Sequence, residues 1–266
     1  MTIFEAIGLG IVQGITEFLP VSSSGHLIIF RELFGINDEF GLAFDALLHL
    51  ATLLAVVLYF RKDIFRLCRS CGGYISGKGI DATNKVLGWA IVLGTIPAVV
   101  IGLQFEDQIE AYFRTSTFVA WMLIAGSLLF ILAELVHKRI AEGNLTVSRG
   151  IVAGLFQALA LLPGFSRSGA TISGGLLAGL NRESAVRFSF LLAIPVIAGG
   201  GLLKLHELVS DGGWNVIDFP TVVSAFTAFI VGLGAIHFLV YYLRKHTLMI
   251  FVVYRVALAL LILILL

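Results

Sequence analysis

Two polar side chains stand four residues apart near the start of the chain, in an otherwise apolar segment. Gln13 and Glu17 therefore share one face of the expected helix, one turn apart, where both can bind the same ligand. An ionisable side chain in such a segment is costly and indicates a functional site. The alternative is a Glu17 that only pairs with a basic side chain for packing.

Three serines and a histidine follow in the run Pro20-Val-Ser-Ser-Ser-Gly-His26. Ser22 or Ser23 can cap the next helix, whose free N–H groups and positive dipole end attract anions. His26 lies three or four residues beyond and brings a proton acceptor to the serine hydroxyls, as a covalent nucleophile requires. The alternative is that the serines only satisfy backbone groups at a break and that His26 is a core residue.

A second polar run, at 163–171, contributes a fixed cation. Arg167 in this run presents a planar fork that suits phosphate oxygens. Its neighbours offer further hydroxyl donors, namely Ser166, Ser168 and Thr171. A buried Arg167 needs an anion, which is either Glu17 or a bound phosphate.

Together these groups form a site suited to a diphosphate. We expect a divalent cation, Mg²⁺ or Ca²⁺, to bridge Glu17 to phosphate oxygens, with Gln13 as a second ligand. Asp45 and His49, also four residues apart, can line the same cavity. The other candidates are given interfacial or loop roles and no chemistry, namely Glu134, His137, His206, His237 and His246.

The composition of the chain indicates which kind of structural element must position these residues. Hydrophobic residues make up 58% of the 266 and charged residues 13%, against about 45–50% and about 25% in soluble domains, so we expect a membrane protein. Its length allows around six full spans plus shorter pieces.

A net charge of +1 without a basic stripe argues against a nucleic-acid partner. The acidic start predicts no signal peptide. Cys68 and Cys71 lack zinc partners and are interpreted as incidental thiols, with a redox role left open.

The apolar segments form two sets of five. The first set is 3–19, 23–34, 41–60, 86–104 and 117–136, and the second is 149–162, 167–180, 185–203, 219–240 and 248–266. Each set begins with two short pieces joined by a polar run. Both sets carry Gln, then Pro, then Ser and Gly, with a shift of one residue on either side of the proline. We predict one all-α polytopic membrane domain over 1–266, with a first repeat over 1–140 and a second over 145–266.

The polar runs constrain the topology. A helix-breaking connection cannot face lipid, because its unpaired backbone groups would be costly there, so each short pair should be re-entrant. Each half then crosses the membrane three times and the halves have opposite orientations. The prediction is an inverted-topology repeat with about six full transmembrane helices and two re-entrant helix pairs, whose polar turns meet near the midplane.

Loop charges give the orientation, because Lys and Arg near span ends stay preferentially in the cytoplasm. The basic loops are 61–85, 137–149 and 241–247, and the acidic loops are 105–116 and 204–218. We therefore expect both termini outside. The first re-entrant pair should enter from outside and the second from the cytoplasm.

The runs Gln13-Gly-Ile-Thr-Glu17-Phe-Leu-Pro-Val-Ser-Ser-Ser-Gly-His26 and Pro163-Gly-Phe-Ser-Arg-Ser-Gly-Ala-Thr171 are recognisable. They closely resemble the two signature motifs of the bacterial undecaprenyl-pyrophosphate phosphatase family, also called bacitracin resistance proteins. The resemblance extends to 44–49, 94–97 and 188–195, and so spans nearly the whole chain. It implies removal of the terminal phosphate from undecaprenyl pyrophosphate in the bacterial inner membrane, which recycles the lipid carrier for peptidoglycan and other envelope polymers.

The resemblance also implies roles for individual residues. Ser23, His26, Ser166, Arg167 and Thr171 match family positions directly. Our hypothesis is that Ser23 attacks the terminal phosphorus, that His26 or Glu17 takes its proton, and that Arg167 holds the diphosphate. The substrate-binding residues are Ser22, Ser24, Ser166, Ser168 and Thr171. The family has Glu or Gln at the position of Gln13, so a second carboxylate ligand is missing from this chain. Attack by a water molecule assisted by His26 stays open.

The rival class is a transporter, for example a flippase for the polyprenyl phosphate lipid, because an inverted repeat with a midplane polar site is also a transporter plan. A purely structural scaffold does not explain a buried Glu17 and Arg167. The oligomeric state is open between a monomer and a homodimer. The natural metal and the preferred prenyl length are open as well.

Overall fold

The computed structural model describes residues 1–36, 41–75, 81–210 and 217–265, and their regular elements are helices. The first half contains α1 (Ile3–Thr16), α2 (Ser23–Phe34), α3 (Gly41–Tyr59), α4 (Arg61–Ile75), α5 (Ala82–Phe113) and α6 (Ser116–His137). The second half contains α7 (Val147–Ala158), the 3-10 helix η1 (Leu159–Leu161), α8 (Arg167–Leu177), α9 (Arg182–Ser210), α10 (Phe219–Tyr242) and α11 (Met249–Leu265).

Length and composition make this an all-α membrane protein. Within the described residues, four helical stretches are long and apolar enough to cross a bilayer, namely Ala82–Phe105, Ser116–His137, Arg182–Leu208 and Phe219–Tyr242. A fifth span is formed if α3 and α4, which bend by 76° at their junction, are taken together. The remaining apolar helices, α1, α7 with η1, and α11, are shorter.

Three segments expected to be loops are partly helical. Residues 61–85 contain α4, and its basic residues lie on a helix that turns away from α3. The helices α5 and α9 also continue past their expected ends at 104 and 203, so the loops 105–116 and 204–218 are shorter than expected. The apolar pattern did not reveal these helical residues because charged residues follow the apolar runs there while the chain stays helical. Lys78 and Asp211, which belong to these loops, lie outside the described residues.

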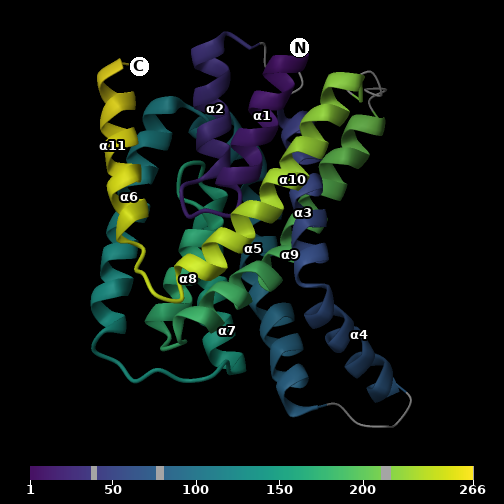
Figure 1. Ribbon diagram of the computed structural model, residues 1–266, viewed down its shortest axis with the longest axis vertical. Coiled ribbons are helices and arrows are strands. Elements are labelled where there is room, and N and C mark those ends of the chain that lie inside the picture. The colour runs from purple at the N-terminus through teal and green to yellow at the C-terminus, as the bar shows by residue number, and fades with distance from the viewer. Residues whose placement is uncertain (37–40, 76–80, 211–216, 266) are drawn as a thin grey trace.

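Helices of the first half pack along helices of the second half. α1 lies along α10, α7 along α5, α3 along α9, and α6 along α11. Glycines allow the closest of these approaches, because a Cβ at Gly10 would overlap the Ser224 carbonyl and a Cβ at Gly154 would overlap Gly94. Figure 1 shows α1 and α2 in the upper half of the molecule, α7 and α8 in the lower half, and both termini at the upper end.

The two short helix pairs therefore approach each other from opposite ends, and their turns meet. The backbone N–H of Gly164 donates to Ser22 Oγ at 3.1 Å, and Ser168 Oγ donates to the Leu19 carbonyl at 3.3 Å. Phe18 anchors the first turn, because it is fully buried and its ring meets that of Phe190 edge to face at 5.7 Å between centroids. The polar turns are thus enclosed by protein.

Candidate active site

Each polar turn ends in a serine cap with the same unusual backbone. Ser22 and Ser166 both have φ of 78°, and they are the only non-glycine residues of the described chain with positive φ. Their hydroxyls accept from the N–H groups of Gly25 at 3.5 Å and Gly169 at 3.3 Å. Backbone strain of this kind tends to persist at functional sites. Because Ser22 and Ser166 are the N-caps, Ser23 and Arg167 are the first residues of α2 and α8.

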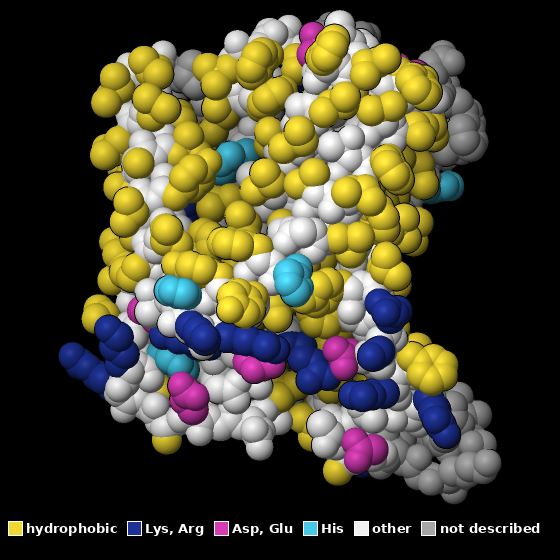
Figure 2. Space-filling model, in the orientation of Figure 1, with side chains coloured by type: hydrophobic (Ala, Val, Ile, Leu, Met, Phe, Trp, Pro, Cys, Tyr) yellow, Lys and Arg dark blue, Asp and Glu magenta, His cyan; other side chains and the backbone are white. Residues whose placement is uncertain are grey.

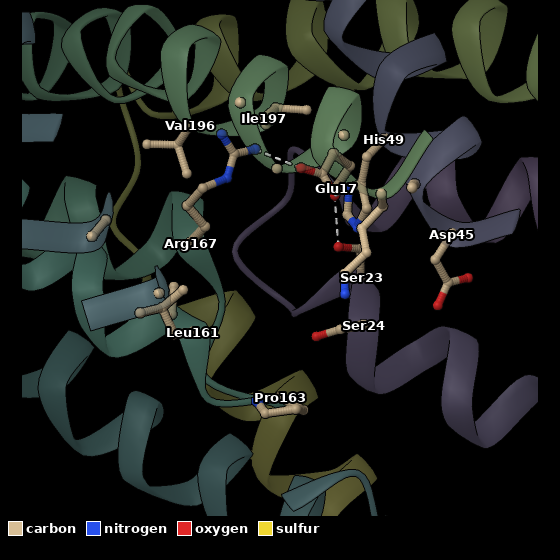
Figure 3. Close-up of a pocket in the computed structure, with 18 of the residues that line it drawn as sticks. Glu17, Ser23, Ser24, Asp45, His49, Leu161, Pro163, Arg167, Val196 and Ile197 are labelled. Carbon is tan, nitrogen blue, oxygen red and sulfur yellow. Dashed lines mark hydrogen bonds and ion pairs between the residues drawn. The ribbon is translucent and has the colours of Figure 1, made fainter. Parts of the chain in front are cut away.

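Glu17 lies between these two helix starts and contacts both. Arg167 Nη2 donates to Glu17 Oε1 at 2.5 Å, and Ser23 Oγ donates to Glu17 Oε2 at 2.7 Å (Figure 3). Glu17 is only 5% exposed. The other arm of the Arg167 fork, Nη1, is buried and no described group accepts from it. That arm is available for a second anion.

Gln13 and His49 complete the surroundings of the carboxylate. Gln13 Nε2 donates to Glu17 Oε2 at 3.1 Å and lies 3.1 Å from His49 Nδ1. His49 Nδ1 is itself 3.0 Å from Glu17 Oε2. Gln13 Oε1 is buried, and among the described residues nothing donates to it. The shared helix face of Gln13 and Glu17 is thus confirmed, and α3 brings His49 to it.

Glu17 and His49 line a cavity of about 640 Å³, and Gln13 lies behind the carboxylate without lining it. Its polar end contains Glu17, Ser22, Ser23, Ser24, Ser166 and Arg167. Apolar residues of α5 and α9 form another part of the wall, including Val99, Leu103, Val196 and Ile197. Gly199 and Gly200 also line it, and a Cβ on either would meet no atom within 4 Å. The cavity therefore combines a charged cluster with an apolar wall.

A second charged group lines the same cavity. Asp45 accepts from Arg31 at 2.6 and 3.2 Å and from Arg114 at 3.2 Å. Lys204 of α9 is another lining residue. The expectation that Asp45 and His49 share the cavity is confirmed. Arg114 and Lys204, which the sequence placed in outer loops, are brought to it by the extended ends of α5 and α9.

Three predicted site residues are placed elsewhere. His26 Nδ1 donates to the Ser22 carbonyl at 2.7 Å, and its Nε2 lies 2.7 Å from the Tyr254 hydroxyl. Both ring nitrogens are therefore occupied away from Ser23, and His26 does not line the cavity. Thr171 Oγ1 donates to the Arg167 carbonyl at 2.9 Å within α8, and Ser168 points to the Leu19 carbonyl. The hydroxyls of Thr171 and Ser168 therefore stabilise the backbone of α8 and of the first polar turn.

Sequence reasoning missed Arg255, which is fully buried in α11. Its guanidinium donates to the carbonyls of Pro20 at 3.4 Å and Gly164 at 3.1 Å, one in each polar turn. Further acceptors on α6 are Met122, Leu123 and Ser127, and the group lies 4.8 Å over the Phe130 ring. A single Arg in the apolar last span was the available signal, because such a charge is expensive in a membrane.

The geometry supports binding and transfer of a phosphate group. Two helix N-termini and a half-free guanidinium provide donors for phosphate oxygens, and Ser23 Oγ with Glu17 provides a hydroxyl and a proton acceptor. No three His, Cys, Asp or Glu side chains of the described chain are grouped to hold a metal ion by themselves. A cation here would need Glu17, the orphaned Gln13 Oε1 and oxygens from substrate or water, a set that Mg²⁺ tolerates.

The fold and the site define a polytopic membrane protein with a buried cluster of a serine, a carboxylate and a guanidinium. The chain belongs to the family of the bacitracin resistance protein BacA, whose model matches residues 6–261. The undecaprenyl-diphosphatase of Chlorobium phaeovibrioides is 42% identical, over 100% of this chain and 98% of that relative. Those of Hahella chejuensis and Saccharophagus degradans are each 42% identical, over 97% of this chain and 96% of theirs. The resemblance inferred from the two motifs is confirmed.

Proposed function

We propose that this protein hydrolyses undecaprenyl diphosphate to undecaprenyl phosphate and inorganic phosphate, the activity for which its relatives are named. The observation that carries the proposal is the junction of Ser23, Glu17 and Arg167, with one guanidinium arm free, at the end of an apolar cavity. A lipid diphosphate has the matching shape, with a multiply charged head and an apolar tail.

In the mechanism, the diphosphate accepts from Arg167 and from the N-termini of α2 and α8. Ser23 Oγ attacks the terminal phosphorus, and its proton passes to Glu17 Oε2, already 2.7 Å away. The bond from this phosphorus to the bridging oxygen breaks, which releases undecaprenyl phosphate. Water then hydrolyses the phosphoserine. Direct attack by water uses the same groups, and in both routes catalysis is mainly positioning and charge stabilisation.

His26 has a different part in this proposal. Its ring bridges the Ser22 carbonyl and the Tyr254 hydroxyl. Glu17 contacts the nucleophile and His26 does not, so the geometry favours Glu17 as proton acceptor. His26 then orients the strained turn from which Ser23 begins α2. Ser22, Ser24 and Ser166 line the cavity and are assigned to the substrate head.

A divalent cation, Mg²⁺ or Ca²⁺, is proposed as the cofactor, with Glu17 and Gln13 Oε1 as protein ligands. When bound it would neutralise charge on the diphosphate oxygens. The support is the buried, unpaired Gln13 Oε1 beside the carboxylate. Because Asp45 is already bound by Arg31 and Arg114, Glu17 would be the one carboxylate ligand, and the ion would depend on substrate oxygens and water for its other positions.

The undecaprenyl tail is assigned to the apolar walls between α5 and α9. Gly199 and Gly200 leave open space there, since a Cβ on either meets no atom within 4 Å. Lateral access between helices lets the lipid bind while its tail remains in an apolar environment. A flippase of the lipid monophosphate is not favoured, because a transporter has no use for a serine hydroxyl held against a carboxylate and the relatives are named as hydrolases.

We also propose that the two halves, 1–140 and 145–266, are an inverted repeat, in which the first two helices of each half, α1 with α2 and α7 with α8, are related by an offset of 144 residues. This offset pairs Ser22 with Ser166, the two residues with φ of 78°. It also pairs Gln13 with Gln157, Gly10 with Gly154, and Ser23 with Arg167. With the serine caps aligned, Pro20 lies opposite Gly164 and Pro163 lies opposite Leu19, so the two prolines are out of register by one residue. The catalytic hydroxyl and the phosphate-binding cation then occupy equivalent positions.

For the topology, we propose that the end opposite the termini faces the cytoplasm of a bacterial inner membrane. Figure 2 shows Lys and Arg side chains gathered in a band across the lower part of the molecule, below a largely apolar surface. Basic residues are retained preferentially on the cytoplasmic side. Both termini would then be outside and the catalytic cavity would open to the outer side. A homodimer and about six full spans stay predictions.

Phosphate release by the purified protein in a neutral detergent tests the function. Undecaprenyl diphosphate with Mg²⁺ or Ca²⁺ should release one phosphate per molecule and leave undecaprenyl phosphate. Isopentenyl diphosphate, which lacks the long tail, should react at least about 100-fold less efficiently, because tail binding contributes to transition-state stabilisation. A folded protein that releases no phosphate from the lipid with either ion contradicts the proposal.

A further inference from the structure

A second cavity, of about 330 Å³, lies where α3, α4, α9 and α10 meet, and none of its lining residues belongs to the catalytic cavity. Its walls combine an apolar part and a basic part. The apolar part contains Tyr59, Phe60, Val186, Val240 and Leu243, and the charged part contains Lys62, Asp63, Arg66, Glu183, Arg187 and Arg244. Four cations against two carboxylates leave an excess of positive charge.

The two carboxylates are already paired. Arg187 Nη2 donates to Asp63 between α9 and α4, and Arg244 Nη2 donates to Glu183 at 2.9 Å between α10 and α9. Lys62 and Arg66 remain, one turn apart on α4. Neither forms an ion pair with any other group of the described chain. The cavity therefore holds two cations that its own acids do not neutralise.

The surroundings are those of a membrane interface. α3 is an apolar helix that ends at Tyr59, and α4, which carries the basic residues, leaves it at 76°, so the cavity lies at the bend between an apolar helix and a basic one. Phe65, which lies between the two free cations on α4, is 67% exposed. An apolar anchor among basic residues is typical of a helix on a membrane surface. The basic band of Figure 2 marks the same end of the molecule.

We propose that this cavity binds the phosphodiester head group of an anionic glycerophospholipid. Lys62 and Arg66 would be the main hydrogen-bond donors to its phosphate oxygens. Basic pockets between membrane helices at this level suit anionic head groups. The apolar wall favours a lipid over free phosphate, because it can cover the first methylene groups of the acyl chains while the phosphate stays at the basic rim. This inference does not rest on the catalytic proposal.

The test is calorimetric titration of the full-length protein in a neutral detergent with dioctanoyl phosphatidylglycerol. Dioctanoyl phosphatidylcholine and inorganic phosphate are the comparison ligands. Saturable binding is expected for phosphatidylglycerol, and binding at least about tenfold weaker is expected for the other two. Equal affinity for phosphatidylcholine would overturn charge recognition, and equal affinity for inorganic phosphate would overturn the lipid as ligand.

Matched variants locate the site. The double variant Lys62→Gln with Arg66→Gln should bind phosphatidylglycerol about 10- to 30-fold more weakly, because each basic contact near an anionic surface contributes appreciably. Lys138→Gln with Arg139→Gln removes two exposed basic residues from another basic segment and should change the affinity less than twofold. If the control weakens binding as much as the cavity variant, the cavity is not the site.

Stability and turnover separate a lost site from a lost fold. The cavity variant should keep the melting temperature and the rate of phosphate release of the unaltered protein in detergent without added lipid. If the double variant does not fold, Arg66→Gln alone replaces it, with an expected loss of about threefold or more in affinity for phosphatidylglycerol. Unchanged affinity in a folded cavity variant overturns the proposal.

Discussion

Arg167 and Glu17 are 150 residues apart in the chain and form an ion pair of 2.5 Å between the two polar turns. The pair links the two turns, and it uses only one arm of the guanidinium, since Nη1 has no described acceptor. In the proposed mechanism a phosphate oxygen accepts from this second arm. Arg167 would then be both a structural partner of Glu17 and a ligand of the substrate.

Replacing Arg167 should remove turnover. Arg167→Ala is expected to lower kcat/KM by at least about 100-fold, because a positioned donor to developing charge is lost. Arg167→Lys should recover little, since an ammonium cannot replace a bidentate fork. Steady-state phosphate release measures both, with Arg139→Ala as an exposed control. A lysine variant near the unaltered rate would show that the fork is not required.

Variants at His26 separate a base from a positioning residue. His26→Asn keeps an N–H that can reach the Ser22 carbonyl, so its kcat should remain within about tenfold of the unaltered value. His26→Ala leaves that buried carbonyl without its partner and should lose about 100-fold. Phosphate release over a range of pH is the measurement. If both variants are equally inactive at every pH while folded, His26 acts as the base.

The single carboxylate predicts unequal roles for Gln13 and Glu17. Glu17→Gln should abolish metal-dependent turnover, because the charged ligand and the acceptor for Ser23 are both lost. Gln13→Ala should cost about tenfold, the value of one neutral oxygen donor. Gln13→Glu should retain activity and lower the metal concentration for half-maximal rate. Metal titrations of the three purified variants measure this, and a folded Gln13→Ala as inactive as Glu17→Gln would refute the single-carboxylate site.

The proposed orientation can be tested through Cys68, an exposed free thiol on α4. In a Cys71→Ser background, Cys68 is the only remaining cysteine in the chain. A membrane-impermeant maleimide should fail to label it in intact cells and should label it after permeabilisation, because α4 would be cytoplasmic. Labelling of intact cells would place the basic end outside and reverse the side to which the catalytic cavity opens.

Arg255 should support stability and activity together. Its guanidinium binds a carbonyl in each polar turn, so Arg255→Met leaves buried acceptors unpaired. Gly126→Ala perturbs the same group indirectly, because a Cβ there would overlap Arg255 Nη2. Both variants should lower the melting temperature in detergent and slow phosphate release. Gly234→Ala is the control, since a Cβ at Gly234 meets no atom within 4 Å. A Gly126→Ala protein as stable and active as this control would contradict the prediction.

The sequence by itself determined the class of the protein and most of the site's members. Apolar runs of membrane length are a local property, so the helices and the membrane setting followed from composition. Glu17 and Arg167 stood out because charges in apolar segments are expensive. The four-residue spacing of Gln13 and Glu17 fixed their common face, since helical periodicity is also local.

Only the tertiary structure decided which groups touch. Ser23 is three residues from His26 and six from Glu17, but the positive φ of Ser22 turns α2 so that Ser23 meets the carboxylate and His26 meets Tyr254. The contribution of Arg255 was likewise out of reach of sequence reasoning, because it depends on carbonyls more than 90 residues away in the chain. Local patterns specify helices, whereas contacts between distant turns follow from how those helices pack.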